Sequence, residues 1–178
     1  MGRGEDVTLA TAGELPPPGV LVAALDAADL DTVVVESTPR RARFLVGEPV
    51  TWQRCELSIL RESLRRPAVA CGDLLVVGLD DAVGLKMRSL HDRGLAEDVM
   101  GVASVAHLYS YRELETLGQG HHEGFSVHEL LTRLEFVDSM DVGVEVRRFA
   151  GAWVEDIKLR RAEEGDVDYD DPDLPHID

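Results

Sequence analysis

Lys86 and Asp98 are the residues whose types and spacing first suggest chemistry. They lie in the stretch GLKMRSLHDRGLAEDVMGVASV, residues 84–105, and each is set among apolar residues at helical spacing. A turn at Arg93-Gly94 would separate two helices and bring the ammonium and the carboxylate together. Their meeting would be either a structural ion pair or part of a site for a phosphate-rich ligand, and the residues alone leave both interpretations open.

The histidines and the glycine-rich segments of this sequence do not match known metal-binding or phosphate-binding motifs. His121-His122 and His128 have no neighbouring cysteine and lack the spacing of a two-histidine, one-carboxylate metal site, so we expect a solvated loop there. His91 and His107 are isolated, and a surface or hydrogen-bonded position is the simplest expectation. Neither the phosphate-binding GxxxxGK[ST] motif nor the dinucleotide-binding GxGxxG motif occurs.

Composition is that of a soluble globular chain. It has 178 residues, of which 44% are hydrophobic and 29% charged. No apolar run approaches the roughly 18 residues of a membrane span, and the N-terminus lacks the pattern of a secretory signal. Cys55 and Cys71 form no CxxC pair, so we expect a cytoplasmic protein without structural zinc.

The net charge of −16 is unevenly distributed. Eight of the 34 acidic residues follow Arg161, where no basic residue occurs, so residues 162–178 are expected to form a disordered acidic tail; the alternative is a segment that covers a basic groove. The rest of the chain is still acidic, which argues against broad nucleic-acid binding but allows a local basic patch. Arg40, Arg41 and Arg43 are expected at a strand edge, where cations discourage edge pairing.

The order of the strands and helices expected from the sequence predicts an α/β fold of the α+β kind. In this fold a small mixed sheet with flanking helices precedes a helical bundle. Strands are expected at residues 5–11, 32–37, 40–47 and 50–60, with a helix at 20–31. The helix with Lys86 should begin at Asp80-Asp81 and end at Gly94. Further helices are expected within 95–109, 110–118, 125–140 and 146–164. The predicted divisions are therefore 1–79, 80–161 and 162–178.

The stretch LDDAVGLKMRSLHDRGLAEDVMGVASV resembles a segment of the AbiEii/AbiGii-type nucleotidyltransferases. In that family it reads lysine, two residues, a small residue and leucine, then Arg-Gly, then Arg-Asp and a further aspartate. The matching residues here are Lys86, Ser89-Leu90, Arg93-Gly94 and Asp98. Glu97 replaces the arginine, and Gly101 replaces the last aspartate.

RGEDVTLAT, residues 3–11, resembles the metal-binding strand of the same family, Arg-x-Ser/Thr-x-Asp-hydrophobic-Asp-Leu. The matching residues are Arg3, Asp6, Val7 and Leu9, while Gly4-Glu5 stands at the Ser/Thr-x step and Thr8 at the second aspartate. The glycine-serine motif and helix that precede this strand in the family would lie before Met1. The resemblance, over residues 3–110, therefore implies an N-terminally truncated or degenerate member.

The resemblance implies a fold like that of DNA polymerase β nucleotidyltransferases and a reaction that uses Mg²⁺ and a nucleoside triphosphate. Carboxylates one residue apart on a strand project to one face and can hold Mg²⁺, and Glu56 is the best candidate for a further ligand from a neighbouring strand. The implied catalytic residues are Asp6, Lys86 and Asp98. Lys86 and Arg93 would bind the nucleotide, and Asp6 and Glu56 the metal.

Thr8 leaves at most Asp6 and Glu56 as metal ligands, a loss that normally costs orders of magnitude in rate. Two hypotheses stay open. The first is a toxin of a toxin–antitoxin system that transfers a nucleoside monophosphate to RNA (tRNA) or protein, with an antitoxin partner encoded nearby. The second is a non-catalytic relative that binds a partner or a nucleotide. A third, a plain α/β interaction domain, would be favoured if the first strand did not pair beside the strand of Glu56.

Overall fold

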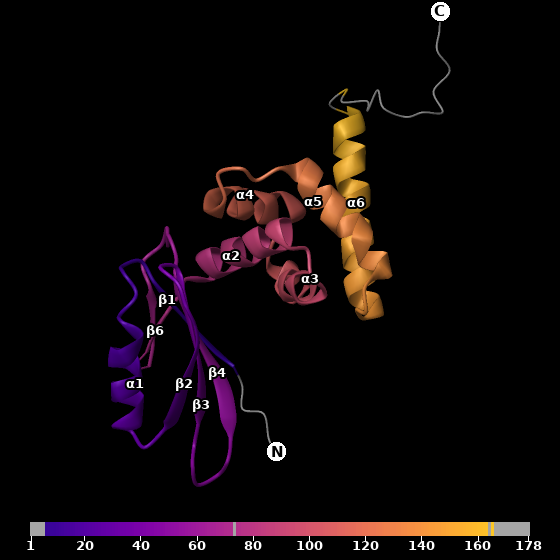
Figure 1. Cartoon of the computed structure of the whole chain (residues 1–178). Helices are drawn as coiled ribbons and strands as arrows, with labels where there is room; N and C mark the ends of the chain where they lie inside the picture. Colours follow the sequence, from indigo (N-terminus) through magenta and orange to yellow (C-terminus); the bar gives the residue numbers. More distant parts are fainter. Residues whose placement is uncertain (1–5, 73, 164, 166–178) are drawn as a thin grey trace, which may run out of the picture. The chain divides into compact units, whose positions relative to one another are not determined.

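The chain folds as two compact units, residues 1–78 and 79–178, each described here by itself. The structure is a computed structural model that describes residues 6–72, 74–163 and 165 (Figure 1). The predicted acidic tail, residues 162–178, therefore lies almost entirely outside the described residues, apart from the end of the last helix. Among the described residues, no helix combines the length and the apolar character needed to cross a membrane.

The first unit is built on a mixed four-stranded sheet, which confirms the predicted fold class. Its strands are β1 (Val7–Thr11), β2 (Asp31–Ser37), β3 (Arg41–Gly47) and β4 (Arg54–Arg61). The spatial order is β1-β4-β3-β2, with β1 parallel to β4 and the other neighbours antiparallel. The three strands β2, β3 and β4 form the predicted meander, and β1 pairs directly beside the strand of Glu56. This pairing opposes the third hypothesis, a plain interaction domain.

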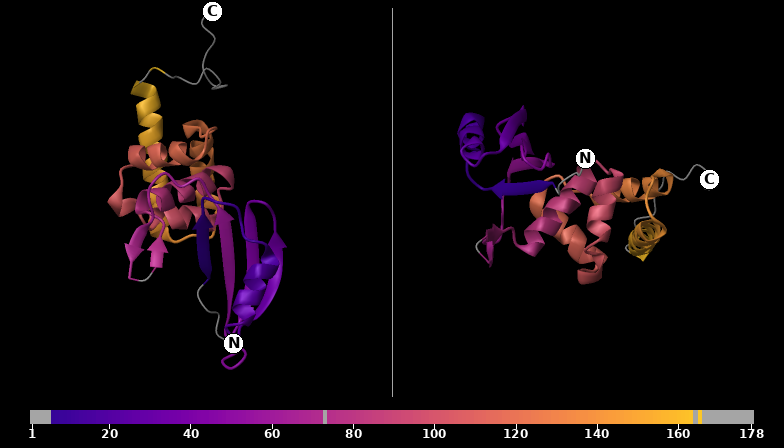
Figure 2. Two further views of the ribbon diagram at one scale, coloured as in Figure 1. Left: turned by 90° about the vertical axis from the view of Figure 1, so that its left-hand side faces the viewer. Right: turned by 90° about the horizontal axis from the view of Figure 1, so that it is seen from below.

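Helix α1 (Pro18–Asp26) covers one face of this sheet (Figures 1 and 2). Proline at the first helical position is pre-set for the helical φ and lacks an N–H that would go unpaired there. Leu21 and Leu25, one turn apart, pack against Phe44 and Ile59 of the sheet. Because side chains alternate along a strand, the polar residues of β3 and β4 project from the opposite face.

Several predicted boundaries in this unit were wrong. Strand β4 begins at Arg54, not at residue 50, because Trp52 takes a left-handed φ of 58° and belongs to the turn after β3. Asp29 has the same left-handed φ and lies in the turn after α1, which ends well before the predicted residue 31. A hairpin of β5 (Val69–Cys71) and β6 (Leu74–Val76) had been only partly predicted.

The described part of the second unit contains five α-helices. They are α2 (Leu79–Asp92), α3 (Ala96–Ala103), α4 (Tyr111–His121), α5 (Val127–Glu135) and α6 (Val144–Glu163). Short 3₁₀ turns follow α3 and α5, at Ala106–Leu108 and Phe136–Ser139. Asp80 and Asp81 lie in the first turn of α2 instead of capping it, and α4 continues to His121 beyond the predicted end at Gly118.

The core of the second unit surrounds Trp153, which is fully buried on α6. Its indole Nε1 donates a hydrogen bond of 2.9 Å to the buried carboxylate of Glu115 on α4. Arg160 donates two more to the same carboxylate, at 2.6 and 3.1 Å. A buried carboxylate is costly unless it is paired and hydrogen-bonded, so these three bonds make the charge tolerable and tie α4 to α6.

Helices α2 and α4 approach each other closely at two glycines, Gly84 and Gly118. A Cβ atom on Gly84 would overlap the ring of His121 and lie 2.8 Å from the carbonyl oxygen of Leu117. A Cβ atom on Gly118 would lie 3.1 Å from the Cβ of Met87. The contact between these helices therefore requires the absence of a side chain at both positions.

Gly84→Ala should destabilise the protein, while Gly151→Ala should stabilise it. Both glycines lie inside helices, but a Cβ on Gly151 of α6 meets no atom within 4 Å. We expect Gly84→Ala to lower the free energy of unfolding by about 1–3 kcal/mol through overpacking. Gly151→Ala should raise it by about 0.5–1 kcal/mol through helix propensity. Urea denaturation followed by circular dichroism measures both; equal effects would contradict the close α2–α4 contact.

Candidate functional site

Asp6 and Glu56 are brought together by the register of β1 on β4. Thr8 lies opposite Ser58 in this parallel pair, so Asp6, two residues earlier, lies level with Glu56. The Oδ1 atom of Asp6 accepts a hydrogen bond from the backbone N–H of Glu56 at 3.1 Å. Leu57, between Glu56 and Ser58, packs toward α1. The two carboxylates therefore share the sheet face that α1 leaves uncovered.

Arg43 is the nearest cation to this pair, and the sequence analysis did not include it in the site. Its Nη2 donates to Oε2 of Glu56 at 2.9 Å, and its Nη1 lies 3.6 Å from Glu36. The second oxygen of Glu56 accepts a bond of 3.3 Å from the hydroxyl of Ser58. The Nε atom of Arg43 is buried without a hydrogen-bond partner among the described residues.

The expectation that Arg41 and Arg43 protect a sheet edge was wrong. Strand β3 lies inside the sheet, between β4 and β2. Arg41 and Arg43 alternate along it with the buried Ala42 and Phe44, so they project from the face opposite α1. This alternation was readable in RRARFLVG, and it would have placed Arg43 on the face of Glu56 once the pairing of β3 with β4 was known.

The residues on this face suit Mg²⁺ in the type of donor that they provide. Mg²⁺ takes oxygen ligands and in nucleotide sites is often held by one or two protein carboxylates together with phosphate oxygens. Asp6 and Glu56 supply two such carboxylates on adjacent strands. Thr8, on the same face, adds a hydroxyl but no charge. Arg43 already neutralises part of the charge of Glu56, so Asp6 is the carboxylate with less competition from the protein.

Lys86 and Asp98, both in the second unit, do not form the ion pair that the sequence suggested. Lys86 is exposed on α2, and its ammonium has no ion pair or hydrogen bond within the described part of the chain. A Cβ atom on Gly101 of α3 would lie 3.3 Å from the Nζ atom of Lys86. An acidic side chain at position 101 would therefore be within reach of the lysine. Glycine instead leaves this ammonium available for a ligand.

Asp98 holds the turn between α2 and α3. Its nearly buried carboxylate pairs with Nη2 of Arg93 and accepts a 3.1 Å hydrogen bond from the backbone N–H of Leu95. Gly94 has a φ of 58°, which lets the chain reverse between the two helices. Arg93 is also 3.4 Å from Glu97. The contacts of Asp98 and Arg93 are therefore those of a helix cap and its partner, and the predicted meeting of Asp98 with Lys86 has no contact to support it.

The expectation of a solvated loop was wrong for His121, whereas His128 is exposed and His91 has the hydrogen-bonded position that was one of its two expected outcomes. His121 ends α4 and is buried, with its Nε2 3.0 Å from Oδ1 of the buried Asp81 on α2. His91, at the end of α2, is buried as well, and its ring stacks on Phe125 with centroids 4.8 Å apart. Each of these contacts joins a residue of α2 to a residue at or just after the end of α4. Because the partners are far apart in the sequence, no local spacing could reveal the contacts.

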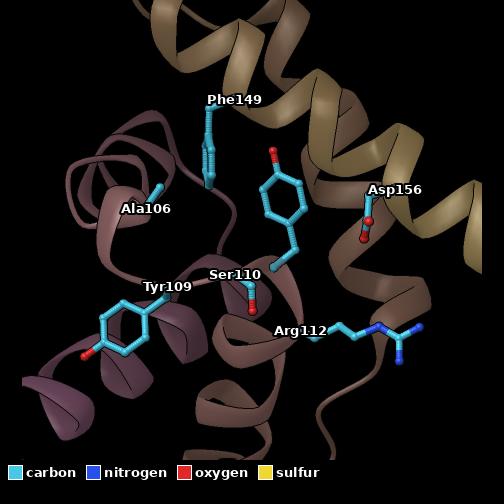
Figure 3. Close-up of a pocket in the computed structure, with 7 residues that line it drawn as sticks. Ala106, Tyr109, Ser110, Arg112, Phe149 and Asp156 are labelled. Carbon is cyan, nitrogen blue, oxygen red and sulfur yellow. The ribbon is translucent and has the colours of Figure 1, made fainter.

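A further hollow, of about 440 Å³, lies in the second unit and was not found from the sequence (Figure 3). It is lined by Ala106, Tyr109, Ser110, Tyr111, Arg112, Phe149 and Asp156. The ring of Tyr111 stacks on Trp153, with centroids 5.1 Å apart and planes 11° from parallel. Burial raises the pKa of the Tyr111 phenol, and the charge of Asp156 raises it further. The hollow therefore offers neutral aromatic surface with one guanidinium and one carboxylate.

The described structure is similar in fold to known nucleotidyltransferase structures. A "putative nucleotidyltransferase" from Helicobacter pylori matches with a TM-score of 0.51 and 12% identity, over 88% of this chain and 80% of that one. JHP933 from Helicobacter pylori matches with a TM-score of 0.49 and 12% identity, over 91% of this chain and 80% of that one. At this level of identity the similarity concerns the fold alone.

MenT4, a nucleotidyltransferase toxin from Mycobacterium tuberculosis, matches with a lower TM-score of 0.43 and 15% identity, over 92% of this chain and 69% of that one. No protein-family model matches the sequence, and no curated protein matches it significantly. The assignment to the AbiEii/AbiGii type therefore stays a prediction from the residues that carry the resemblance, while the nucleotidyltransferase-like fold has structural support.

Asp98→Ala should destabilise the second unit, whereas Glu97→Ala should not. Asp98→Ala removes a cap hydrogen bond and the partner of Arg93, and we expect a loss of about 1–3 kcal/mol in the free energy of unfolding. The exposed pair of Arg93 with Glu97 contributes less than about 0.5 kcal/mol. Thermal and urea denaturation of the two variants measure the difference. If Asp98→Ala kept full stability and lost nucleotide binding, Asp98 would belong to a ligand site instead of a structural turn.

Proposed function

We propose that this protein is a Mg²⁺-dependent nucleotidyltransferase that transfers a nucleoside monophosphate from a nucleoside triphosphate to RNA or protein, with tRNA as the first acceptor to test. The observation that carries the proposal is the juxtaposition of Asp6 and Glu56 on the uncovered face of the sheet. The similarity in fold to the Helicobacter pylori protein supports it. Two adjacent carboxylates are the kind of protein ligand that holds Mg²⁺ together with the phosphates of a bound nucleotide.

In this proposal Asp6 and Glu56 hold the metal through carboxylate oxygens. Bound Mg²⁺ would neutralise the triphosphate and favour attack by an acceptor hydroxyl. Arg43 holds Glu56 in place through its 2.9 Å bond, and its guanidinium is close enough to the carboxylates to contact a phosphate oxygen as well. Ser58 fixes the other oxygen of Glu56, so the carboxylate has a defined orientation before the ligand arrives.

Lys86 is the proposed phosphate-binding residue of the second unit. A compact ammonium binds phosphate oxygens well, and the protein offers it no carboxylate in the described part of the chain. Arg93 is the weaker candidate, because Asp98 and Glu97 already neutralise its charge. We therefore place nucleotide binding on Lys86 first and regard Arg93 and Asp98 as the residues that shape the adjoining turn.

The resemblance to AbiEii/AbiGii-type proteins also suggests a biological role for this activity. It supports a toxin that works in the cytoplasm and is neutralised by an antitoxin protein encoded nearby. The acidic character of the chain, with a net charge of −16, means that a tRNA acceptor would have to be recognised through a local patch instead of the whole surface.

A second candidate function, a non-catalytic module that binds a nucleotide or a partner protein, is favoured by two observations. Thr8 occupies the position where the related strand has its second aspartate. Arg43 forms an ion pair with Glu56 and so supplies part of the positive charge that a metal would otherwise bring. Such a protein would keep the fold and the ligand-binding lysine while transferring nothing.

Asp6→Asn and Glu56→Gln should each reduce nucleotide transfer by about 100-fold or more, because each removes a charge that holds the metal. The assay incubates the full chain with Mg²⁺, each of the four α-labelled nucleoside triphosphates and total tRNA, and follows label on RNA and on protein. Asp31→Asn is the matched control, since Asp31 is an exposed carboxylate on β2 at the other edge of the same sheet. It should keep full activity.

Nucleotide binding, measured by calorimetry in the presence of Mg²⁺, separates the two candidate functions. Binding that Lys86→Ala weakens about tenfold, without any transfer, would support the non-catalytic module. Transfer that Asp6→Asn and Glu56→Gln leave intact would show that the carboxylate pair is not the reaction centre. If the protein neither bound nucleotide nor transferred it, the nucleotidyltransferase and the nucleotide-binding module would both be wrong, and only a module that binds a partner protein would remain.

A further inference from the structure

His91, Asp92 and His122 form a compact group of potential metal ligands in the second unit. His91 and Asp92 are the last two residues of α2, and His122 directly follows α4. One ligand atom from each of the three residues lies within 4.8 Å of the others. Oδ1 of Asp92 is 3.0 Å from Nδ1 of His91 and 3.1 Å from Nε2 of His122. Both imidazoles therefore point a nitrogen at the same carboxylate oxygen.

The surroundings of His91 include a partner for the tautomer that a metal ligand needs. Its side chain is only 4% exposed, and its Nε2 is 2.8 Å from Oε2 of Glu129 on α5. When Nε2 carries the proton, it donates to this carboxylate, and Nδ1 presents its lone pair to Asp92 and His122. A metal-bound histidine commonly donates its second ring nitrogen to a carboxylate in this way, which fixes the ring and strengthens the ligand.

The second ring nitrogen of His91 also lies 3.1 Å from the backbone N–H of Ser126, which would donate to the other tautomer. A single nitrogen cannot serve both partners at once, so a proton or a metal at Nδ1 decides between Glu129 and Ser126. The Nδ1 atom of His122 is buried and lacks a hydrogen-bond partner among the described residues. The ring of His122 is packed against that of His91, with centroids 4.8 Å apart, so both rings are held near Asp92.

The chemistry of the three donors selects the class of ion. Two imidazole nitrogens and one carboxylate oxygen suit Zn²⁺ and similar divalent transition metals, whereas Mg²⁺ and Ca²⁺ prefer oxygen ligands alone. We propose that His91, Asp92 and His122 bind a divalent transition-metal ion of the Zn²⁺ class, with Glu129 as the residue that orients His91. Three protein ligands leave a fourth tetrahedral position for water or an outside ligand.

The ligands of this site all belong to the second unit, whereas Asp6 and Glu56 of the proposed Mg²⁺ site belong to the first, so the two sites share no residue. The proposed transition-metal site joins the C-terminal ends of α2 and α4, and through Glu129 it reaches α5. A metal bound there stabilises the folded state by mass action, since the ligands are assembled only when the helices are packed. The proposal therefore stands whether or not the protein transfers nucleotides.

The test uses the full chain after treatment with EDTA and dialysis, titrated with ZnCl₂ by calorimetry and with CoCl₂ by visible absorption. We expect one ion per chain, the absorption bands of four-coordinate Co²⁺ with nitrogen and oxygen ligands, and a rise in the thermal midpoint that EDTA reverses. His122→Ala and Asp92→Asn should abolish this binding, and Glu129→Gln should weaken it about tenfold.

His107→Ala is the matched control, because His107 is an exposed histidine outside the group and its loss should leave binding unchanged. His91→Ala is avoided as the main variant, since removing a buried ring can unfold the protein; His122 and Asp92 are more exposed. Circular dichroism confirms that the variants are folded. Absence of a stoichiometric Zn²⁺ site, or binding that His122→Ala and Asp92→Asn leave intact, overturns the proposal. Thiolate charge-transfer bands with Co²⁺ would also overturn it, by placing the ion on Cys55 or Cys71.

Discussion

The proposed reaction centre depends on the parallel pairing of β1 with β4. A parallel pair has an evenly spaced register, and here that register sets Thr8 opposite Ser58 and so brings Asp6 level with Glu56. A shift of one residue would turn Asp6 toward the face that α1 covers, where an unpaired carboxylate would be costly. The core under α1, with Phe44 fully buried, fixes which face each strand presents.

In the second unit the corresponding constraint is the close contact of α2 with α4. Glycine at 84 and 118 lets the two backbones approach, and the space beside Gly84 is filled by the ring of His121. This contact also sets the end of α4 beside the end of α2, where His122 meets His91 and Asp92. The same packing therefore determines a buried histidine–aspartate pair and the group that we propose as a transition-metal site.

Polar side chains in this protein divide into those already satisfied and those left available. Glu115 and Asp98 are buried carboxylates with several partners each, and such contacts stabilise a single arrangement of helices. Lys86 is exposed and has no such partner in the described part of the chain. Glu56 is intermediate between these two cases, since Arg43 and Ser58 hold it and its side chain is only part-buried. A charged side chain is therefore a candidate for ligand binding when other protein groups leave its charge unpaired, and a structural residue when they pair it, whatever its type.

Local patterns in the sequence determined most of the secondary structure, because alternation along a strand and apolar spacing along a helix are properties of neighbouring residues. The choice of Asp6 and Glu56 came from the resemblance of their segments to a nucleotidyltransferase site. The same patterns failed at Trp52, where a left-handed turn interrupts an apparently continuous strand. Only the tertiary structure decided that Asp98 pairs with Arg93 and not with Lys86, that Arg43 holds Glu56, and that His122 meets His91. These outcomes depend on strand register and helix packing, which join residues distant in the chain and leave no signal in the spacing of either partner.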